Sequence, residues 1–355
     1  MKVLVLSCST GGGHNSCARY IKEEFDSFNI ECDFYDFFDL INSKAKEMSS
    51  KLYLFTLNND GKIFKNFYKI GEAYSKSNVT SPVYLINKMH KKKIYDFICE
   101  NGYDLVITTH LFPALTLTAI NKDKKYNNIH FIFVATDYEP CPFMEESEPD
   151  YFIIQKGCES RFNKTSSDKL ITSGIPVSSR FVNNVQDIRN KYNITCEKVI
   201  LVMLGSMGFG NISDVILRLV SINNVKIFIV CGSNKKLYDS FINYDDKVIP
   251  LPFINNVNDY IYSSDVVISK PGGLSTTEIA AIRKPLIHMF AIPGIEEYNE
   301  KFFEGRGMSR VCNIDNIKEM VIKCFDDTKF INNQKKYIYS DSAYRLVKLV
   351  IDNYH

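Results

Sequence analysis

The sequence lacks several features that would place it in a common class of protein. No apolar run reaches the ~18 residues of a membrane-spanning helix. The ten cysteines include no Cys-x-x-Cys pair and no disulfide-type spacing, which favours reduced, mostly buried thiols over a zinc site. The net charge of +2 is too small to indicate a nucleic-acid-binding protein. The apolar run at residues 1–6 is too short for a signal peptide and predicts a strand.

The chain does have the length and the apolar content for two domains. With 355 residues, 45% of them hydrophobic, each half can bury a core. Apolar runs that predict buried strands lie at residues 2–6, 30–35, 103–109, 129–135 and 150–154, and again at 199–204, 226–230, 248–253, 265–269 and 285–289. Helical spacing separates many of these runs, so the pattern predicts two α/β units with parallel sheets.

The most informative stretch is residues 269–299, SKPGGLSTTEIAAIRKPLIHMFAIPGIEEYN. A strand, a Pro-Gly-Gly turn at 271–273 and a helix start follow one another. This order presents unpaired backbone N–H groups at the edge of a sheet, where the helix dipole also favours a phosphate. After the next strand come Glu296, Glu297 and Asn299, whose side chains can hydrogen-bond sugar hydroxyls. A phosphate site beside a polyol site is what a nucleotide sugar requires.

A second glycine-rich loop, SCSTGGGHNSCA at residues 7–18, follows the first strand. We expect a helix from His14 or Asn15, with an apolar stripe at Ala18, Ile21, Phe25 and Phe28. His14 has two interpretations that the sequence leaves open. It either caps the helix and holds the loop, or acts as a general base, because histidine titrates near neutral pH.

A nicotinamide-binding site is the weaker interpretation of this loop. The dinucleotide motif G-x-G-x-x-G is incomplete, because Ser16 stands where the third glycine would be. Asp33 or Asp36 could still bind a ribose. A dehydrogenase therefore stays open as an alternative.

Taken together, these motifs resemble those of glycosyltransferase family 28. The resemblance rests on KPGGLSTTE, PGIEEYN, the SCSTGGGHNSCA loop, the TDY at 136–138 and the GIP at 174–176. The nearest members in pattern are diacylglycerol glycosyltransferases and monogalactosyldiacylglycerol synthases. The resemblance implies the α/β GT-B fold: two Rossmann-like domains that face a central cleft, with a C-terminal helix that returns to the first domain. It implies an N-terminal acceptor domain at 1–178, a donor domain at 179–336 and the returning helix at 337–355.

The resemblance also implies an inverting transfer of a hexose from UDP-glucose or UDP-galactose to a lipid hydroxyl, with diacylglycerol as the expected acceptor. His14 and Asp137 would be the catalytic residues. The residues that would bind the donor are Gly12, Gly13, Gly205, Ser206, Met207, Phe253, Ile254, Gly272, Gly273, Ser275, Thr276, Glu278, Glu296, Glu297 and Asn299. We expect no cofactor and no metal, and the chain has no Asp-x-Asp metal motif.

Several positions keep a structural alternative. Ser275 and Glu278 fit a helix capping box as well as a ribose site. Asp137 could cap a turn, and His110, at a strand end, could be a loop hydrogen-bonder or a ligand contact. The chain departs from the family pattern at Ile295 and Tyr298 and has no tryptophan, which leaves the sugar and the acceptor open. An N-acetylglucosaminyltransferase, a UDP-sugar epimerase and a non-catalytic UDP-sugar sensor remain alternatives.

Residues 44–95 differ in character from the rest of the chain. They contain eleven lysines against three acidic residues, with aromatic residues between them. Such a mixture suits an anionic membrane surface, although an ordinary solvated helical insertion has the same composition. RNA binding has no motif behind it. We therefore expect a protein that is cytoplasmic and peripheral on the inner face of the cell membrane. The excess of lysine over arginine, 34 to 9, predicts a bacterial origin.

Overall fold

The computed structural model describes residues 1–9, 12–41, 68, 71, 74, 79–195, 197–204 and 211–354. By its internal contacts the chain divides into two compact units. Unit 1 comprises Met1–Ser179, Ile292–Ile295 and Asp341–His355, and unit 2 comprises Arg180–Ala291 and Glu296–Ser340. Each unit contains one six-stranded sheet in which all paired strands are parallel.

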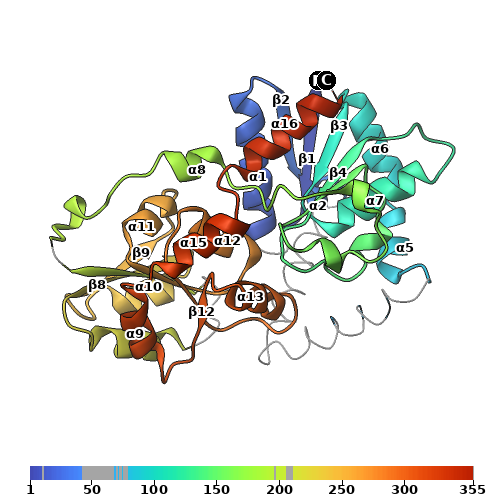
Figure 1. Ribbon diagram of the computed structural model, residues 1–355. Helices are drawn as coiled ribbons and strands as arrows, with labels where there is room; N and C mark the ends of the chain where they lie inside the picture. Colours follow the sequence, from blue (N-terminus) through green and yellow to red (C-terminus); the bar gives the residue numbers. More distant parts are fainter. Residues whose placement is uncertain are drawn as a thin grey trace. The chain divides into compact units, whose positions relative to one another are not determined.

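The sheet of unit 1 has the strand order β2-β1-β3-β4-β5-β6 (Figure 1). Its strands are β1 Lys2–Ser7, β2 Glu31–Asp36, β3 Leu105–Thr108, β4 Phe131–Val134, β5 Tyr151–Ile153 and β6 Leu170–Ile171. The central strands β3 and β4 are buried at every residue and almost entirely apolar, because they are covered on both faces. Parallel strands all end at one edge, so the residues after β1, β3 and β4 come together there.

The helices of unit 1 cover both faces of this sheet. They are α1 Gly12–Ser27, α2 Phe37–Ile41, α5 Pro82–Lys88, α6 Lys91–Glu100, α7 Leu111–Asn121 and α16 Ser342–Tyr354. Leu4 and Leu6 of β1 share a buried cluster with Ile98 of α6 and Leu117 of α7. The last helix, α16, lies alongside α1 (Figure 1), where the Tyr344 and Phe28 rings are 5.7 Å apart.

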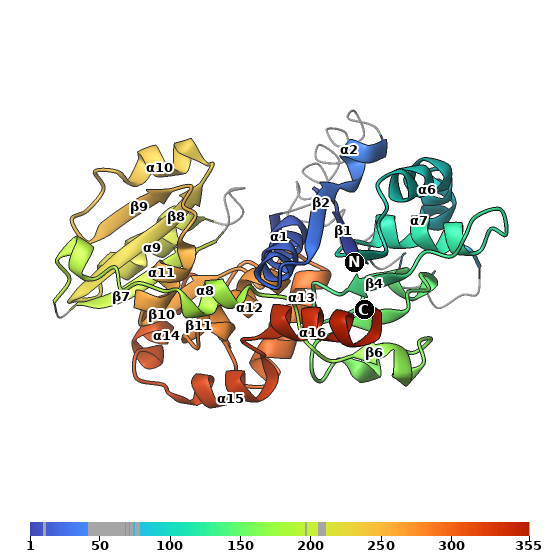
Figure 2. The ribbon, with the colours of Figure 1, turned by 90° about the horizontal axis from the view of Figure 1, so that it is seen from above.

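The sheet of unit 2 has the order β12-β11-β10-β7-β8-β9, and β7, β8 and β9 run side by side in Figure 2. Its strands are β7 Lys198–Met203, β8 Val225–Gly232, β9 Val248–Pro252, β10 Val266–Ser269, β11 Leu286–His288 and β12 Arg310–Val311. The helices in this part of the chain are α8 Ser179–Asn183, α9 Ile212–Val220, α10 Lys235–Phe241, α11 Val257–Ser263, α12 Gly273–Ala281, α13 Ile295–Gly305, α14 Ile317–Cys324 and α15 Lys329–Tyr337. Ile200 and Val202 of β7 are buried with Val215 of α9 and Val321 of α14.

All ten predicted strands are present, with ends that differ from the expected ones by up to two residues. Two helices begin at other residues than predicted. Helix α1 starts at Gly12 rather than at His14 or Asn15. The final helix, predicted from residue 337, is α16 and starts later, at Ser342, because α15 ends at Tyr337 and an extended residue and a turn separate the two helices.

Two further predictions concern cysteines and membrane segments. Six of the described cysteines are buried, one is exposed and two are intermediate, and all nine are free thiols. Among the described residues, the structure contains no helix with the length and apolar character needed to span a bilayer.

Candidate active site

His14 lies at the carboxyl edge of the unit 1 sheet, where two neighbouring strand ends hold its ring. Its Nδ1 is 2.9 Å from the carbonyl oxygen of Thr109 and 3.0 Å from Oγ1 of Thr136. Thr109 in turn donates its hydroxyl to the His14 carbonyl at 3.2 Å. Thr109 follows β3 and Thr136 follows β4, so the ring is fixed by residues more than 90 positions away in sequence.

The contact with Thr109 fixes the tautomer of His14. A carbonyl oxygen only accepts hydrogen bonds, so Nδ1 carries the proton when the ring is neutral. The lone pair then lies on Nε2. Burial lowers the pKa of His14 below its usual value, while the charge of Asp137 opposes that shift. His14 is therefore neutral at neutral pH and able to accept a proton at Nε2.

His110 is the second histidine at this edge. Its Nδ1 accepts the backbone N–H of Phe112 at 3.2 Å and so caps α7. Its ring meets the His14 ring edge to face, with centroids 4.9 Å apart. Burial, and to a smaller degree the neighbouring His14, holds the pKa of His110 well below its usual range. His110 is thus a neutral helix cap in direct contact with the candidate base.

The glycine loop before α1 is anchored by polar side chains. The hydroxyl of Ser9 donates to Asp36 and accepts from Asn15 Nδ2 at 2.9 Å. Asp36 also accepts the Phe38 backbone N–H at 3.0 Å, so its carboxylate serves the loop and helix α2. These contacts weaken the dinucleotide interpretation, in which Asp36 would bind a ribose. Gly12 faces open space, since a Cβ there would meet no atom within 4 Å.

In unit 2 the Pro-Gly-Gly turn leads directly into helix α12. Gly272 is the N-cap and Gly273 the first helical residue. Ser275 is therefore already inside the first turn, and the capping-box interpretation of Ser275 and Glu278 is wrong, because the helix begins earlier than that motif requires. The backbone N–H of Thr276 donates to the Gly272 carbonyl at 3.0 Å.

Helix α13 packs its first turns against this turn. Lys270 Nζ lies 3.3 Å from Oε1 of Glu296, in an ion pair with little exposure. Asn299 is fully buried and donates Nδ2–H to the Pro271 carbonyl at 3.0 Å. A Cβ at Gly272 would lie 3.8 Å from Glu296 Oε1. The structure thus brings Glu296, Asn299 and the glycine turn together, with Asn299 supporting the turn from within.

The other predicted donor residues differ in their accessibility. Glu278 and Thr276 are buried, whereas Ser275 and Glu297 are partly exposed. Phe253 and Ile254 follow β9. Phe253 is 72% exposed, which leaves its aromatic face accessible to a nucleobase. The remaining three predicted residues, Gly205, Ser206 and Met207, lie outside the described residues.

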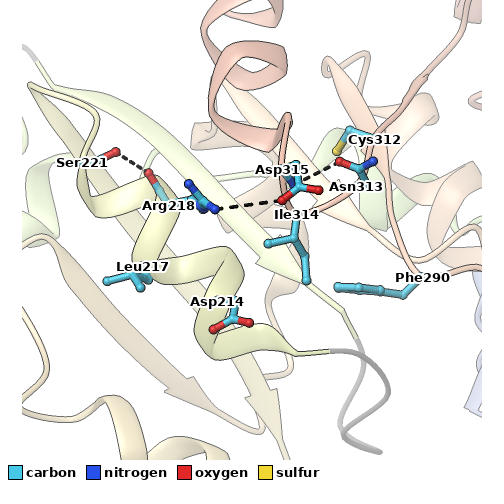
Figure 3. A pocket seen from close by; sticks show the side chains of 9 residues that line it. All are labelled: Asp214, Leu217, Arg218, Ser221, Phe290, Cys312, Asn313, Ile314 and Asp315. Carbon is cyan, nitrogen blue, oxygen red and sulfur yellow. Dashed lines mark hydrogen bonds and ion pairs between the residues drawn. The ribbon is translucent and has the colours of Figure 1, made fainter.

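Unit 2 also contains a cavity of about 860 Å³ between α9 and the loop after β12 (Figure 3). Leu217, Phe290 and Ile314 form its apolar side, and Arg218 forms an ion pair with Asp315 at 4.0 Å on its rim. The other lining residues are Asp214, Ser221, Cys312 and Asn313. Among the predicted donor residues that the structure describes, none lines this cavity.

Comparison with protein families matches each half of the chain to a known model. Residues 14–177 match the monogalactosyldiacylglycerol (MGDG) synthase family, and residues 199–337 match the glycosyltransferase family 28 C-terminal domain. These two matches confirm the resemblance to glycosyltransferase family 28 that the sequence motifs predict. They also support the predicted enzyme class, a UDP-sugar-dependent hexosyltransferase.

Curated relatives are similar to this chain over nearly its whole length. A processive diacylglycerol beta-glucosyltransferase of Bacillus subtilis is 26% identical over 95% of this chain and 90% of the relative. An enzyme of the same name from Bacillus cytotoxicus is 24% identical over 100% of this chain and 94% of the relative.

Solved structures with the same fold support the GT-B architecture. MurG of Acinetobacter baumannii superposes with a TM-score of 0.64 at 12% identity, covering 99% of each chain. The spinosyn rhamnosyltransferase SpnG superposes with a TM-score of 0.68 at 9% identity, covering 99% of this chain and all of that chain. At these identities the likeness concerns the fold alone.

Sequence reasoning missed two residues that the structure places at the glycine turn. Lys270 stands in the KPGG motif, and nothing in the sequence indicates its ion pair with Glu296. His288 lies in an apolar strand, where a single histidine is unusual. That isolated polar residue in the strand PLIHM was the available signal.

Proposed function

We propose that this protein transfers a hexose from UDP-glucose or UDP-galactose to a lipid hydroxyl, with diacylglycerol as the acceptor. The observation that carries the proposal is the ring of His14, whose Nδ1 is fixed by the Thr109 carbonyl so that Nε2 is the basic nitrogen. The chain's similarity to diacylglycerol glucosyltransferases supports the same conclusion. Unit 1 takes the acceptor and unit 2 takes the donor.

His14 Nε2 removes the proton of the acceptor hydroxyl as its oxygen attacks the anomeric carbon. An alcohol is a poor nucleophile at neutral pH, and a positioned base contributes roughly 10²–10⁴-fold to the rate. The bond from the anomeric carbon to the UDP oxygen breaks in the same displacement, so UDP leaves with the bonding pair and the configuration inverts. The carboxylate of Asp137 favours the imidazolium that forms on His14.

The departing diphosphate needs positive potential that is already in place. In unit 2 the backbone amides at Gly272–Gly273 provide it, because the first turn of α12 leaves N–H groups without intrahelical acceptors. In unit 1 the first turn of α1 presents the amides of Gly12–Gly13 in the same way. Stabilisation by fixed dipoles is often the largest contribution to catalysis. Glu278 binds the ribose, Phe253 and Ile254 contact the uracil, and the remaining donor contacts come from Ser275, Thr276, Glu296 and Glu297. Asn299 contributes by holding the Pro271 carbonyl of the glycine turn.

The acceptor side of unit 1 docks on an anionic membrane. Most of residues 44–78 lie outside the described residues, but helix α5 and its flanks present four large apolar side chains, each more than half exposed: Val79, Leu85, Ile86 and Met89. Lys88 ends the same helix, and Lys92 follows with a side chain that is 77% exposed. Apolar side chains next to lysines suit the interface of an anionic bilayer.

Vesicle binding tests the membrane surface. The protein is expected to sediment with phosphatidylglycerol vesicles and to be released by high salt, since surface charges are screened. The double substitution Ile86→Asp and Met89→Asp is expected to abolish sedimentation. Leu217→Asp is the matched control, because Leu217 is 58% exposed in unit 2 and far along the chain. Equal sedimentation of both variants would contradict the assignment of α5.

A panel of labelled UDP-sugars, with and without diacylglycerol, tests the transfer itself. The expected product is a glycolipid formed only when the acceptor is present. A UDP-sugar isomer without acceptor would indicate an epimerase, and transfer only from UDP-N-acetylglucosamine would indicate the other transferase class. Thermal stabilisation by UDP without turnover of any lipid would indicate a sensor, since a ligand that binds only the folded state raises its stability.

A further inference from the structure

A buried chain of three polar side chains connects the start of β12 to the first turn of α12. His288, the last residue of β11, places Nε2 at 3.2 Å from Oγ1 of Thr276 and Nδ1 at 3.2 Å from Oγ of Ser309. All three residues have no exposed surface. The His288 ring also meets the Phe303 ring of α13, with centroids 5.8 Å apart.

Both ring nitrogens of His288 are satisfied whichever tautomer it adopts. A neutral imidazole has one donor and one acceptor, and a hydroxyl can serve as either. Burial lowers the pKa of His288 to about 3, so the ring stays neutral and the chain is uncharged. A fully satisfied buried network of this kind holds its members rigidly, because any member that moves leaves an unpaired polar group.

The member of this chain that matters for ligand binding is Thr276. It lies one turn into α12, and its backbone N–H closes the first turn on the Gly272 carbonyl at 3.0 Å. The hydroxyl of the next residue, Thr277, donates to the Gly273 carbonyl at 2.7 Å. A shift of Thr276 would therefore shift the turn that carries the Gly272 and Gly273 amides.

An apolar residue at position 288 would fill the same space without a polar network. The neighbouring strand residues Leu286 and Ile287 are apolar and fully buried. A histidine costs desolvation at such a site unless both nitrogens are bonded. Three buried polar residues at the strand end beside the glycine turn point to a positional role there.

We propose that His288 is a positioning residue that fixes the first turn of α12, through Thr276 Oγ1, in the geometry that binds the diphosphate of the donor. The inference rests on the proposed donor site. It concerns a residue that does not touch the ligand and acts through Thr276. It assigns Ser309 the role of holding the opposite side of the His288 ring.

The test compares UDP binding with folding stability in the full-length protein. His288→Leu and Thr276→Val are each expected to raise the Kd of UDP about tenfold. The double variant is expected to have the same Kd as either single variant, because both substitutions remove the same link. Thr276→Ser keeps the hydroxyl that bonds His288 and is expected to bind UDP more tightly than Thr276→Val. His288→Gln, which keeps a polar group, is the second variant if His288→Leu does not fold.

Tyr192→Phe is the matched control. It removes a hydroxyl contact of 2.9 Å to Tyr260, also in unit 2 but away from the glycine turn. It is expected to lower the melting temperature and leave the Kd of UDP unchanged. His288 variants that lose stability with an unchanged Kd would overturn the proposal. A wild-type protein that does not bind UDP at all would instead overturn the proposed donor site.

Discussion

The two histidines at the carboxyl edges of the two sheets are held in opposite ways. His14 in unit 1 is partly exposed, with one ring nitrogen on a backbone carbonyl and a carboxylate near enough to influence its pKa. His288 in unit 2 is fully buried between two hydroxyls. A general base must exchange its proton with substrate and solvent, whereas a positioning residue must keep a fixed protonation state. The surroundings of each ring therefore indicate its role better than the residue type does.

The largest expected effect is the loss of the base. His14→Ala is expected to lower the turnover number by roughly 10²-fold or more, the usual contribution of a positioned general base. The affinity for UDP is expected to stay within about twofold, because the ring acts on the acceptor hydroxyl. Steady-state kinetics with labelled UDP-sugar and calorimetry with UDP measure the two quantities.

His130→Ala is the control for the His14 variant. His130 lies in the same unit, is mainly exposed, and pairs with Asp150 at 2.9 Å. Its removal is expected to leave turnover unchanged. A normal turnover number for His14→Ala would reduce His14 to a loop-holding residue and end the contrast with His288.

The second prediction uses the charge of Asp137. If His14 works as the neutral base, as proposed, turnover falls as the pH drops through the His14 pKa, which lies below its usual value. Asp137 raises that pKa, so Asp137→Asn is expected to move the acid limb of the pH profile to lower pH. The same change is expected to lower maximal turnover by roughly tenfold, since it weakens the base.

An acid limb that stays in place in Asp137→Asn would show that another group titrates there. Glu300 on α13 is the other candidate for the group that titrates in the acid limb, because burial raises its pKa to about 7. Glu300→Gln is expected to leave the acid limb unchanged. A shift in that variant and not in Asp137→Asn would move the titrating group to unit 2.

The sequence alone was sufficient for ten of the twelve strands in the described residues. Apolar runs such as 199–204 and 265–269 are long, and burial on both faces leaves them unbroken. The two-residue strands β6 and β12 are too short to produce a pattern. The start of α1 was misplaced by two residues because a run of glycines carries no helix signal, although the helix extends into it.

The direction of individual side chains was not predictable. Asn299 stands in a motif of apparently exposed polar residues, yet it is fully buried on the Pro271 carbonyl. Ser275 resembled a helix cap because its spacing to Glu278 fits a capping box, but Gly272 holds that position. In both cases tertiary packing decides which residue is buried or caps the helix, and the local sequence does not predict it.

The smallest expected effect concerns His288 and acid stability. In the unfolded chain its pKa is near the usual 6.5, while burial lowers it to about 3 in the folded protein. Between these values the unfolded chain binds more protons, so the free energy of unfolding falls as the pH falls. His288 alone contributes about 1 kcal/mol of this loss between pH 6 and pH 5. Urea unfolding of the wild type and of His288→Gln is therefore expected to show a shallower pH dependence in the variant over that range. Parallel pH dependences would mean that His288 exchanges protons in the folded state as His14 does, and the distinction between the two histidines would not hold.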